Sequence, residues 1–211
     1  MNTKTKPFRG LHLWELALLA GLAAVLLTGA LSLGEQTALS EKVVRLHVLA
    51  NSDSQEDQAL KLRVRDRVLA ETETLLESST DRNEAERRLT AALPELERLA
   101  AEEITESGYD YTVSVRLEET AFPTRTYDGF TLPAGEYLAL RVLIGAAEGQ
   151  NWWCVVFPPL CTAAASDVPA VALDAGLTDR EVALITEADG GYVLKFKTVE
   201  LWQTLKAKLG G

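Results

Sequence analysis

Histidine and cysteine are scarce in this chain of 211 residues, which has only two of each. A Cys/His nucleophile needs a thiol beside an imidazole, and His47 with Cys154 or Cys161 is the available combination, because His12 falls in the N-terminal apolar region. A zinc site needs three or four ligands, so these residues fall short unless a carboxylate joins them. We therefore expect no metal site, and a histidine on a strand face is more often packed than catalytic.

The motifs that mark common catalytic and nucleotide-binding sites are also missing. The sequence has no serine-centred motif, no glycine-rich phosphate loop and no HExxH pattern. It also has no internal repeat, no low-complexity tract and no long linker. These absences predict a protein that is not an enzyme and needs no cofactor.

The N-terminal region has the composition of an export signal. Lys4, Lys6 and Arg9 are followed by residues 16–33, which carry no charge and are rich in Leu and Ala. A basic start before an apolar core is typical of a secretory signal or of a single membrane anchor. Small residues around Ala30 suit signal-peptidase cleavage, whereas an uncleaved chain would be tethered by residues 11–33. Either alternative places the rest of the protein outside the cytoplasm.

Negative charge dominates the remainder of the chain. Residues 1–30 contribute +2 to a total of −10, so the exported part carries −12. Most of this charge lies in residues 71–119, where fourteen acids face five arginines. Such a surface would be repelled by nucleic acid and by an anionic membrane, so nucleic-acid binding is excluded.

The first half of the exported part predicts a strand followed by helices. Residues 42–50 alternate as a strand, and residues 54–77 repeat as a helix with Asp53 as N-cap and Glu56 as its capping-box partner. A second helix is expected after Thr80. Pro94 is expected to begin a third helix, which Gly108 ends.

The second half predicts further strands with one more cap signal. Thr178 and Glu181 have the spacing of a capping box, and residues 162–176 are expected to form an extended connection. Strands are expected at residues 111–117, 137–144, 152–157 and 192–197, with a closing helix at 198–209.

These elements predict a single α+β domain after an N-terminal signal or anchor helix. Its mixed sheet would have about five strands, accompanied by four or five helices. Residues 1–33 would be the signal or anchor, residues 40–161 the main domain, and residues 162–211 a C-terminal α/β extension packed on the same domain.

Both cysteines lie in one uncharged segment, residues 151–161, which also holds two tryptophans and a Pro-Pro pair. Seven extended residues would separate the cysteines by roughly 20 Å, so a disulfide requires the chain to fold back at Pro158 and Pro159. Export favours a Cys154–Cys161 disulfide, and two buried free thiols are the alternative.

Several blocks of the sequence resemble the stage II sporulation protein R family. They include Leu-Pro-Ala-Gly-Glu-Tyr at residues 132–137 and Asn-Trp-Trp-Cys at residues 151–154. The resemblance runs in order from about Val43 to Cys161, and it is loose around residues 177–196. The blocks that carry it are residues 45–54, 56–62, 64–66, 122–124, 132–142 and 151–161.

The resemblance implies an exported signalling protein rather than an enzyme. Members of this family are made in the forespore and pass into the space between forespore and mother cell. There they signal to a membrane-embedded aspartic protease, which cleaves the precursor of the mother-cell sigma factor. The residues alone leave two other classes open: a secreted hydrolase that uses His47 and Cys154, and a non-catalytic structural protein of the intermembrane space.

Two loops are our candidates for the surface that recognises the protease. Asparagines stand at two strand ends, where they serve either recognition or ordinary turn hydrogen bonds. The two adjacent tryptophans alternate along a strand, so one would face the core and the other would be an aromatic anchor if left uncovered. The candidate residues are Asn51, Ser52, Asp53, Asp57, Asn151, Trp152 and Trp153.

Overall fold

The computed structural model describes residues 12–161 and 167–186, and the chain divides into two units, residues 1–35 and 36–211. Helix α1 (Leu13–Ser40) begins in the first unit and ends in the second. The side chains of Leu13, Trp14 and Leu16 near its start are exposed. Among the residues that the structure describes, no helix combines the length and the apolarity needed to cross a membrane.

A four-stranded mixed sheet forms the centre of the second unit, in the order β2-β5-β1-β6. Strand β1 runs parallel to β5 and antiparallel to β6, while β2 runs antiparallel to β5. A separate two-stranded sheet is made by β3 and β4. The bounds are β1 Val44–Leu49, β2 Val113–Phe122, β3 Arg125–Tyr127, β4 Phe130–Leu132, β5 Gly135–Ile144 and β6 Asn151–Phe157.

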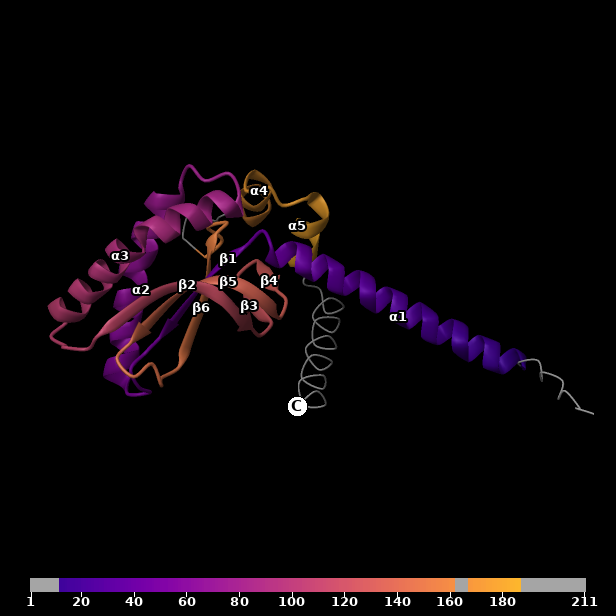
Figure 1. Ribbon diagram of the computed structural model, residues 1–211, viewed down its shortest axis with the longest axis horizontal. Helices are drawn as coiled ribbons and strands as arrows, with labels where there is room; N and C mark the ends of the chain where they lie inside the picture. Colours follow the sequence, from indigo (N-terminus) through magenta and orange to yellow (C-terminus); the bar gives the residue numbers. More distant parts are fainter. Residues whose placement is uncertain (1–11, 162–166, 187–211) are drawn as a thin grey trace, which may run out of the picture. The chain divides into compact units, whose positions relative to one another are not determined.

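Helices α2 (Gln55–Leu76) and α3 (Arg82–Glu106) cover one face of this sheet (Figure 1). Alternate residues of each strand point toward them, because side chains switch face at every residue of a strand. Full burial of each Leu or Val in this layer stabilises the fold by about 1.5–3 kcal/mol. The fully buried members include Leu46 and Val48 of β1, Leu140 of β5, and Leu60 and Val64 of α2.

A second core lies on the other side of the sheet. It joins the β3–β4 sheet to helices α4 (Val168–Asp174) and α5 (Asp179–Thr186). Phe130, Leu132 and Ile185 are buried here together with Tyr137 and Val155 of the main sheet. The sheet is therefore the middle layer of the second unit.

The structure confirms the α+β class and the mixed sheet, which has four strands rather than about five. The strands predicted around β1, β2, β5 and β6 are all present, and the predicted capping box begins α5. There Thr178 Oγ1 accepts from the Glu181 N–H at 3.3 Å, while the Glu181 carboxylate accepts from the Thr178 N–H at 2.7 Å. The predicted strand 192–197 and helix 198–209 lie outside the described residues.

Three local predictions were wrong. Pro94 does not begin a helix but lies inside α3, because the apolar stripe continues across it from Leu89 to Leu96 and packing outweighs the lost hydrogen bond. The N-cap of α2 is Ser54 rather than Asp53. The expected extended connection at 162–176 contains α4, whose N-cap is Asp167.

Candidate functional site

The loop after β1 is organised around the carboxylate of Asp57, in the first turn of α2. Its Oδ2 accepts hydrogen bonds from Asn51 Nδ2 at 2.8 Å and from Ser52 Oγ at 2.6 Å. The residue is 4% exposed, and its backbone N–H donates to the N-cap Ser54 Oγ. The hydrogen bond from Ser52 is the main cause that lowers the pKa of Asp57, so this carboxylate stays ionised at neutral pH.

The same loop is locked against the β5–β6 connection. Asn51 Oδ1 accepts from the Ala146 N–H at 2.9 Å. A Cβ on Gly145, whose φ is +57°, would lie 2.3 Å from Asn51 Oδ1, and one on Gly149 would lie 2.2 Å from the Ser52 carbonyl oxygen. Glycine is required at position 145 because the Asn51 side chain fills the space and φ is positive, and at position 149 because the backbone of Ser52 lies against it. Asn51, Ser52 and Asp57 therefore have a structural role.

Asp53 differs from the other three candidates in this loop because it is exposed. The nearby ammonium of Lys61 is buried, and it donates to the Gln150 carbonyl oxygen at 2.8 Å. Burial lowers the pKa of Lys61, and the negative charge of Asp53 opposes that shift. Of the four candidates in this loop, Asp53 is exposed, Asn51 and Ser52 are half-buried, and Asp57 is buried.

The two tryptophans at the start of β6 point to opposite sides of the sheet, as the alternation predicts. Trp152 is 37% exposed, and the guanidinium of Arg65 from α2 lies 4.2 Å from its ring centre. Trp153 is half-buried and stacks on His47, with ring centres 3.9 Å apart and planes inclined by 14°. Neither ring is fully buried in the core.

The side chain of His47 connects β1 to the start of β6. Its Nε2–H donates to Asn151 Oδ1 at 2.6 Å, because an amide oxygen can only accept. Burial lowers the pKa of His47 to about 4, so the imidazole is neutral at pH 7. The other ring nitrogen, Nδ1, is buried without a partner among the described residues.

Arg45 lies two residues before His47, on the same face of β1. It is fully buried, with its guanidinium 4.0 Å from the ring centre of Phe122 and 5.0 Å from that of Tyr137. Its Nη2 donates to the Tyr127 hydroxyl at 2.6 Å, while Nε and Nη1 have no partner in the described part of the chain. We call Arg45, His47, Phe122, Asn151 and Trp153 the His47 face.

Buried polar atoms without partners are concentrated on and beside the His47 face. Besides those of Arg45 and His47, they include Nε1 of Trp153 and Nε of Arg141. Such atoms are costly when unpaired, and most of these are N–H donors, which hydrogen-bond to carbonyl or carboxylate oxygens. The guanidinium of Arg125 also lies 5.7 Å from the Trp153 ring centre.

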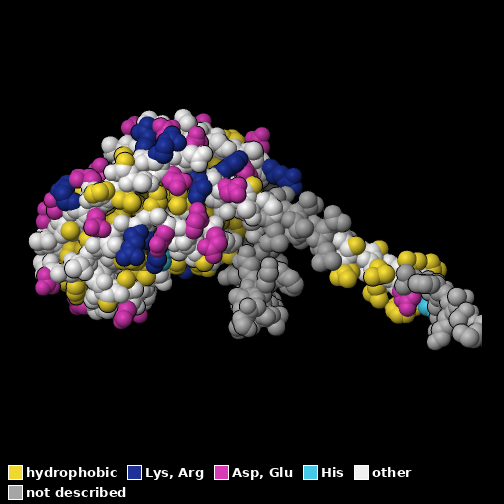
Figure 2. Space-filling view, in the orientation of Figure 1, with side chains coloured by type: hydrophobic (Ala, Val, Ile, Leu, Met, Phe, Trp, Pro, Cys, Tyr) yellow, Lys and Arg dark blue, Asp and Glu magenta, His cyan; other side chains and the backbone are white. Residues whose placement is uncertain are grey.

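Arg45 gives this face a positive charge, whereas the whole chain carries a net charge of −10. Figure 2 shows acidic side chains scattered over the visible face of the second unit rather than gathered in one patch. Our sequence reasoning missed Arg45, although the signal was present. A strand that buries valine and leucine on one side carries Arg45 and His47 on the other.

The cysteines do not pair with His47. Cys154 points toward α2 and α3, where it packs with the core, whereas His47 lies on the opposite face of the sheet. Both cysteines are free, and the chain folds back after β6 so that Val155 N–H donates to Cys161 Sγ at 3.1 Å. A hydrogen bond from Cys154 lowers the pKa of the Cys161 thiol. The disulfide stays a prediction.

The part of the chain that the structure describes contains no group of side chains that could form a metal site. No three side chains among His, Cys, Asp and Glu are grouped there in a way that could hold a metal ion.

Comparisons with known proteins found a matching family model and a related curated protein. The family model for stage II sporulation protein R matches residues 40–167. A curated protein of Bacillus subtilis (strain 168), named stage II sporulation protein R, is 40% identical over 127 residues, covering 60% of this chain and 57% of the relative. The chain therefore spans less than two thirds of that relative's length. No solved structure matches.

Proposed function

The chain belongs to the stage II sporulation protein R family, and we propose that it is an exported signal that activates a membrane-embedded aspartic protease of the mother cell. That protease would then cleave the precursor of a mother-cell sigma factor. The observation that carries this proposal is the family match over residues 40–167. It is supported by the basic and apolar sequence that precedes the matched region.

The proposed place of action is the space between forespore and mother cell. Residues 16–33 contain no charged side chain and follow three basic residues, a pattern typical of export or of membrane tethering. A protein in that space can contact the outer side of a receptor protease without crossing a second membrane. We propose that it acts there either secreted or tethered through residues 11–33.

We propose that the His47 face, together with Trp152, is the surface that contacts the protease. Strand β6 lies at the edge of the sheet, so its first residues are accessible beside the aromatic face. Trp153 and Asn151 combine a large ring with an exposed polar side chain, which is a composition typical of binding hot spots. The unpaired donors nearby are buried, and they would bind oxygen atoms of the partner once side chains of the face move to expose them.

The role proposed for the protein is that of an activating ligand without catalysis of its own. Cys154 and His47 lie on opposite faces of the sheet, so they do not form a thiol–imidazole pair. Binding energy at the protease can shift its equilibrium only if the active form binds this ligand more tightly than the inactive form does. Activation would therefore depend on the strength of contact with the active form.

The experiment that tests the proposal is reconstitution in a non-sporulating bacterial host. This chain, the protease and the sigma-factor precursor are produced together, and precursor cleavage is followed by immunoblot. We expect cleavage when all three are present and none when this chain is omitted. Absence of cleavage with all three proteins detected, and with this chain exported, would refute the proposal.

A further inference from the structure

A pocket of about 510 Å³ lies between the end of α2, the turn after β6 and α4. This volume is within the range of about 300–1,000 Å³ that is common for binding pockets. It lies at the Phe157 end of β6, whereas Asn151 and Trp153 of the His47 face are at the start of the same strand. Apolar groups contributed by Leu76, Phe157, Pro159, Val171 and Ala175 form part of its lining.

Three carboxylates line the same pocket, and no Lys, Arg or His does. Glu73 and Glu77 are four residues apart at the end of α2, so they share one side of the helix and repel each other. Asp174 is the last residue of α4. Within the described residues, none of these three carboxylates takes part in an ion pair or a side-chain hydrogen bond.

The position of these acids is unfavourable for the helix that carries two of them. The C-terminal end of a helix carries partial negative charge from its unpaired carbonyl groups, which favours Lys or Arg there. The last turn of α2 has no basic residue, and its C-cap is Glu77. The pocket lining is therefore acidic, and two of its carboxylates stand at a helix end that favours basic residues, an arrangement more often found at functional sites than elsewhere.

Ser79 provides a second, independent indication of a ligand. Its Oγ is buried and has no hydrogen-bond partner among the described residues, although the residue lines the pocket. Its backbone N–H already donates to the Leu76 carbonyl oxygen at 2.9 Å, which holds the residue in the turn. A buried hydroxyl without a partner is uncommon, and rotation of this short side chain toward the pocket would let a donor group there satisfy it.

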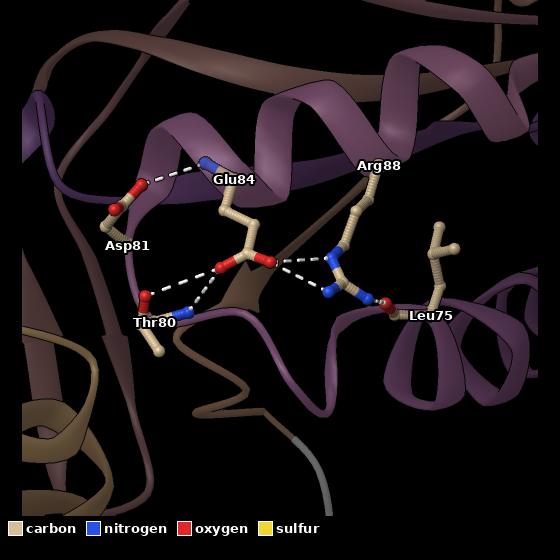
Figure 3. A network of polar contacts seen from close by, with 5 residues as sticks. All are labelled: Leu75, Thr80, Asp81, Glu84 and Arg88. Atoms are coloured by element: carbon tan, nitrogen blue, oxygen red, sulfur yellow. Dashed lines mark hydrogen bonds and ion pairs between the residues drawn. The ribbon is translucent and has the colours of Figure 1, made fainter.

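The turn that carries Ser79 is held in place by the network drawn in Figure 3. Glu84 accepts hydrogen bonds from the Thr80 N–H at 3.2 Å and from Arg88 Nη2 at 2.7 Å. Arg88 Nη1 donates to the Leu75 carbonyl oxygen at 3.3 Å, which ties α3 to the end of α2. This wall of the pocket is therefore formed before any ligand binds, which reduces the entropy lost on binding.

We propose that this pocket binds one basic side chain, Arg or Lys, presented by a partner protein. The aliphatic stem of such a side chain would pack on the apolar lining, and its charged end would meet Glu73, Glu77 and Asp174. Its N–H groups would also donate to Ser79 Oγ. The proposal concerns binding by the pocket itself, so it does not depend on the function proposed above.

The test uses the full chain and the peptide acetyl-Gly-Arg-Gly-amide, with a peptide containing citrulline in place of Arg as the uncharged control. Binding is followed through the amide NMR signals of Ser79, Val171 and Ala175. We expect saturable shifts at these positions with the Arg peptide, and binding at least about tenfold weaker with citrulline. Equal responses to the two peptides, or none to either, would overturn the proposal.

Variants identify the carboxylates responsible. Glu77→Lys should abolish the shifts, and the milder Glu73→Gln should weaken binding several-fold while leaving the fold intact. Glu106→Lys is the matched charge reversal, because Glu106 is exposed at the C-terminal end of α3 and does not line the pocket. Unchanged binding by a folded Glu77→Lys or Glu73→Gln protein, or an equal loss in Glu106→Lys, would contradict the proposal.

Discussion

His47 on β1 and Asn151 at the start of β6 are joined by a hydrogen bond of 2.6 Å between Nε2 and Oδ1. The bond joins residues 104 positions apart and holds the imidazole against Trp153. Nε2 donates in the neutral tautomer and in the imidazolium alike, so this bond alone does not fix the charge of the ring. Burial lowers the pKa of His47 to about 4, so the neutral ring, with its proton on Nε2, is the form present at pH 7.

The first prediction concerns the pH dependence of stability. The pKa of His47 is lowered to about 4 in the folded protein, against about 6.5 for an exposed histidine. The unfolded chain therefore binds a proton more readily between these values, and stability falls as the pH drops from about 6.5 toward 4. We expect a loss on the order of 2 kcal/mol from this group.

The measurement is urea unfolding of the wild type and of His47→Gln at pH 7 and pH 4.5. Acidic groups titrate similarly in both proteins, so the difference between the two pH dependences isolates His47. The variant should lose less stability than the wild type over this interval. Equal losses would mean that His47 is not held neutral by burial.

The second prediction concerns Asp57, the acceptor for Asn51 and Ser52. Asp57→Ala should lower the free energy of unfolding by about 2–4 kcal/mol, because two donors lose their acceptor in a buried place. The exposed neighbour Asp53 provides the control, since Asp53→Ala should change stability by less than about 0.5 kcal/mol. Chemical denaturation decides, and similar effects of the two changes would show that Asp57 has no special structural role.

The third prediction concerns Pro94 inside α3. Pro94→Ala supplies the N–H that the Thr90 carbonyl lacks, and alanine has the higher helix propensity. Thermal unfolding should show a stabilisation of about 1–3 kcal/mol. Destabilisation would indicate that the proline ring makes a packing contact that outweighs the missing hydrogen bond.

The fourth prediction concerns the two cysteines, which lie close enough for their thiols to hydrogen-bond. In protein recovered from an oxidising compartment, we expect a Cys154–Cys161 disulfide. Its intact mass should be lower than that of the reduced protein by two hydrogen atoms, and alkylation without reduction should label neither cysteine. Labelling of Cys161 before reduction would contradict the prediction, and Cys161→Ser provides the unbridged reference.

The sequence was informative wherever one periodic pattern ran through a whole element. The alternation in β1 and the Thr178–Glu181 capping box were correctly predicted because neighbouring residues determine them. Strands β3 and β4 have three residues each, too few for a period to be recognised. The prediction at Pro94 was wrong because the apolar residues of α3 on both sides of it pack into the core, and this packing outweighs the tendency of proline to end a helix.

The candidate site was only partly predictable because its contacts join residues that are far apart in the sequence. Asn51 contacts Asp57 and Ala146, and the second of these is 95 residues away. Sequence reasoning could identify the polar residue but could not decide between recognition and a structural role. The burial of Arg45 beneath Phe122 likewise depends on the pairing of β2, β5 and β1, which no local pattern shows.

The fifth prediction addresses the central claim, that this protein activates the protease through the His47 face. Precursor cleavage in the reconstituted host is measured for the wild type, for Trp153→Ala and for Asn83→Ala, an exposed position at the start of α3. Circular dichroism and exported protein levels show that each variant is folded and present. We expect Trp153→Ala to reduce cleavage at least about tenfold, as loss of an aromatic anchor does, while Asn83→Ala cleaves like the wild type. Wild-type cleavage with a folded Trp153→Ala protein would contradict the role of this face, and no cleavage with the wild type would contradict the signalling function itself.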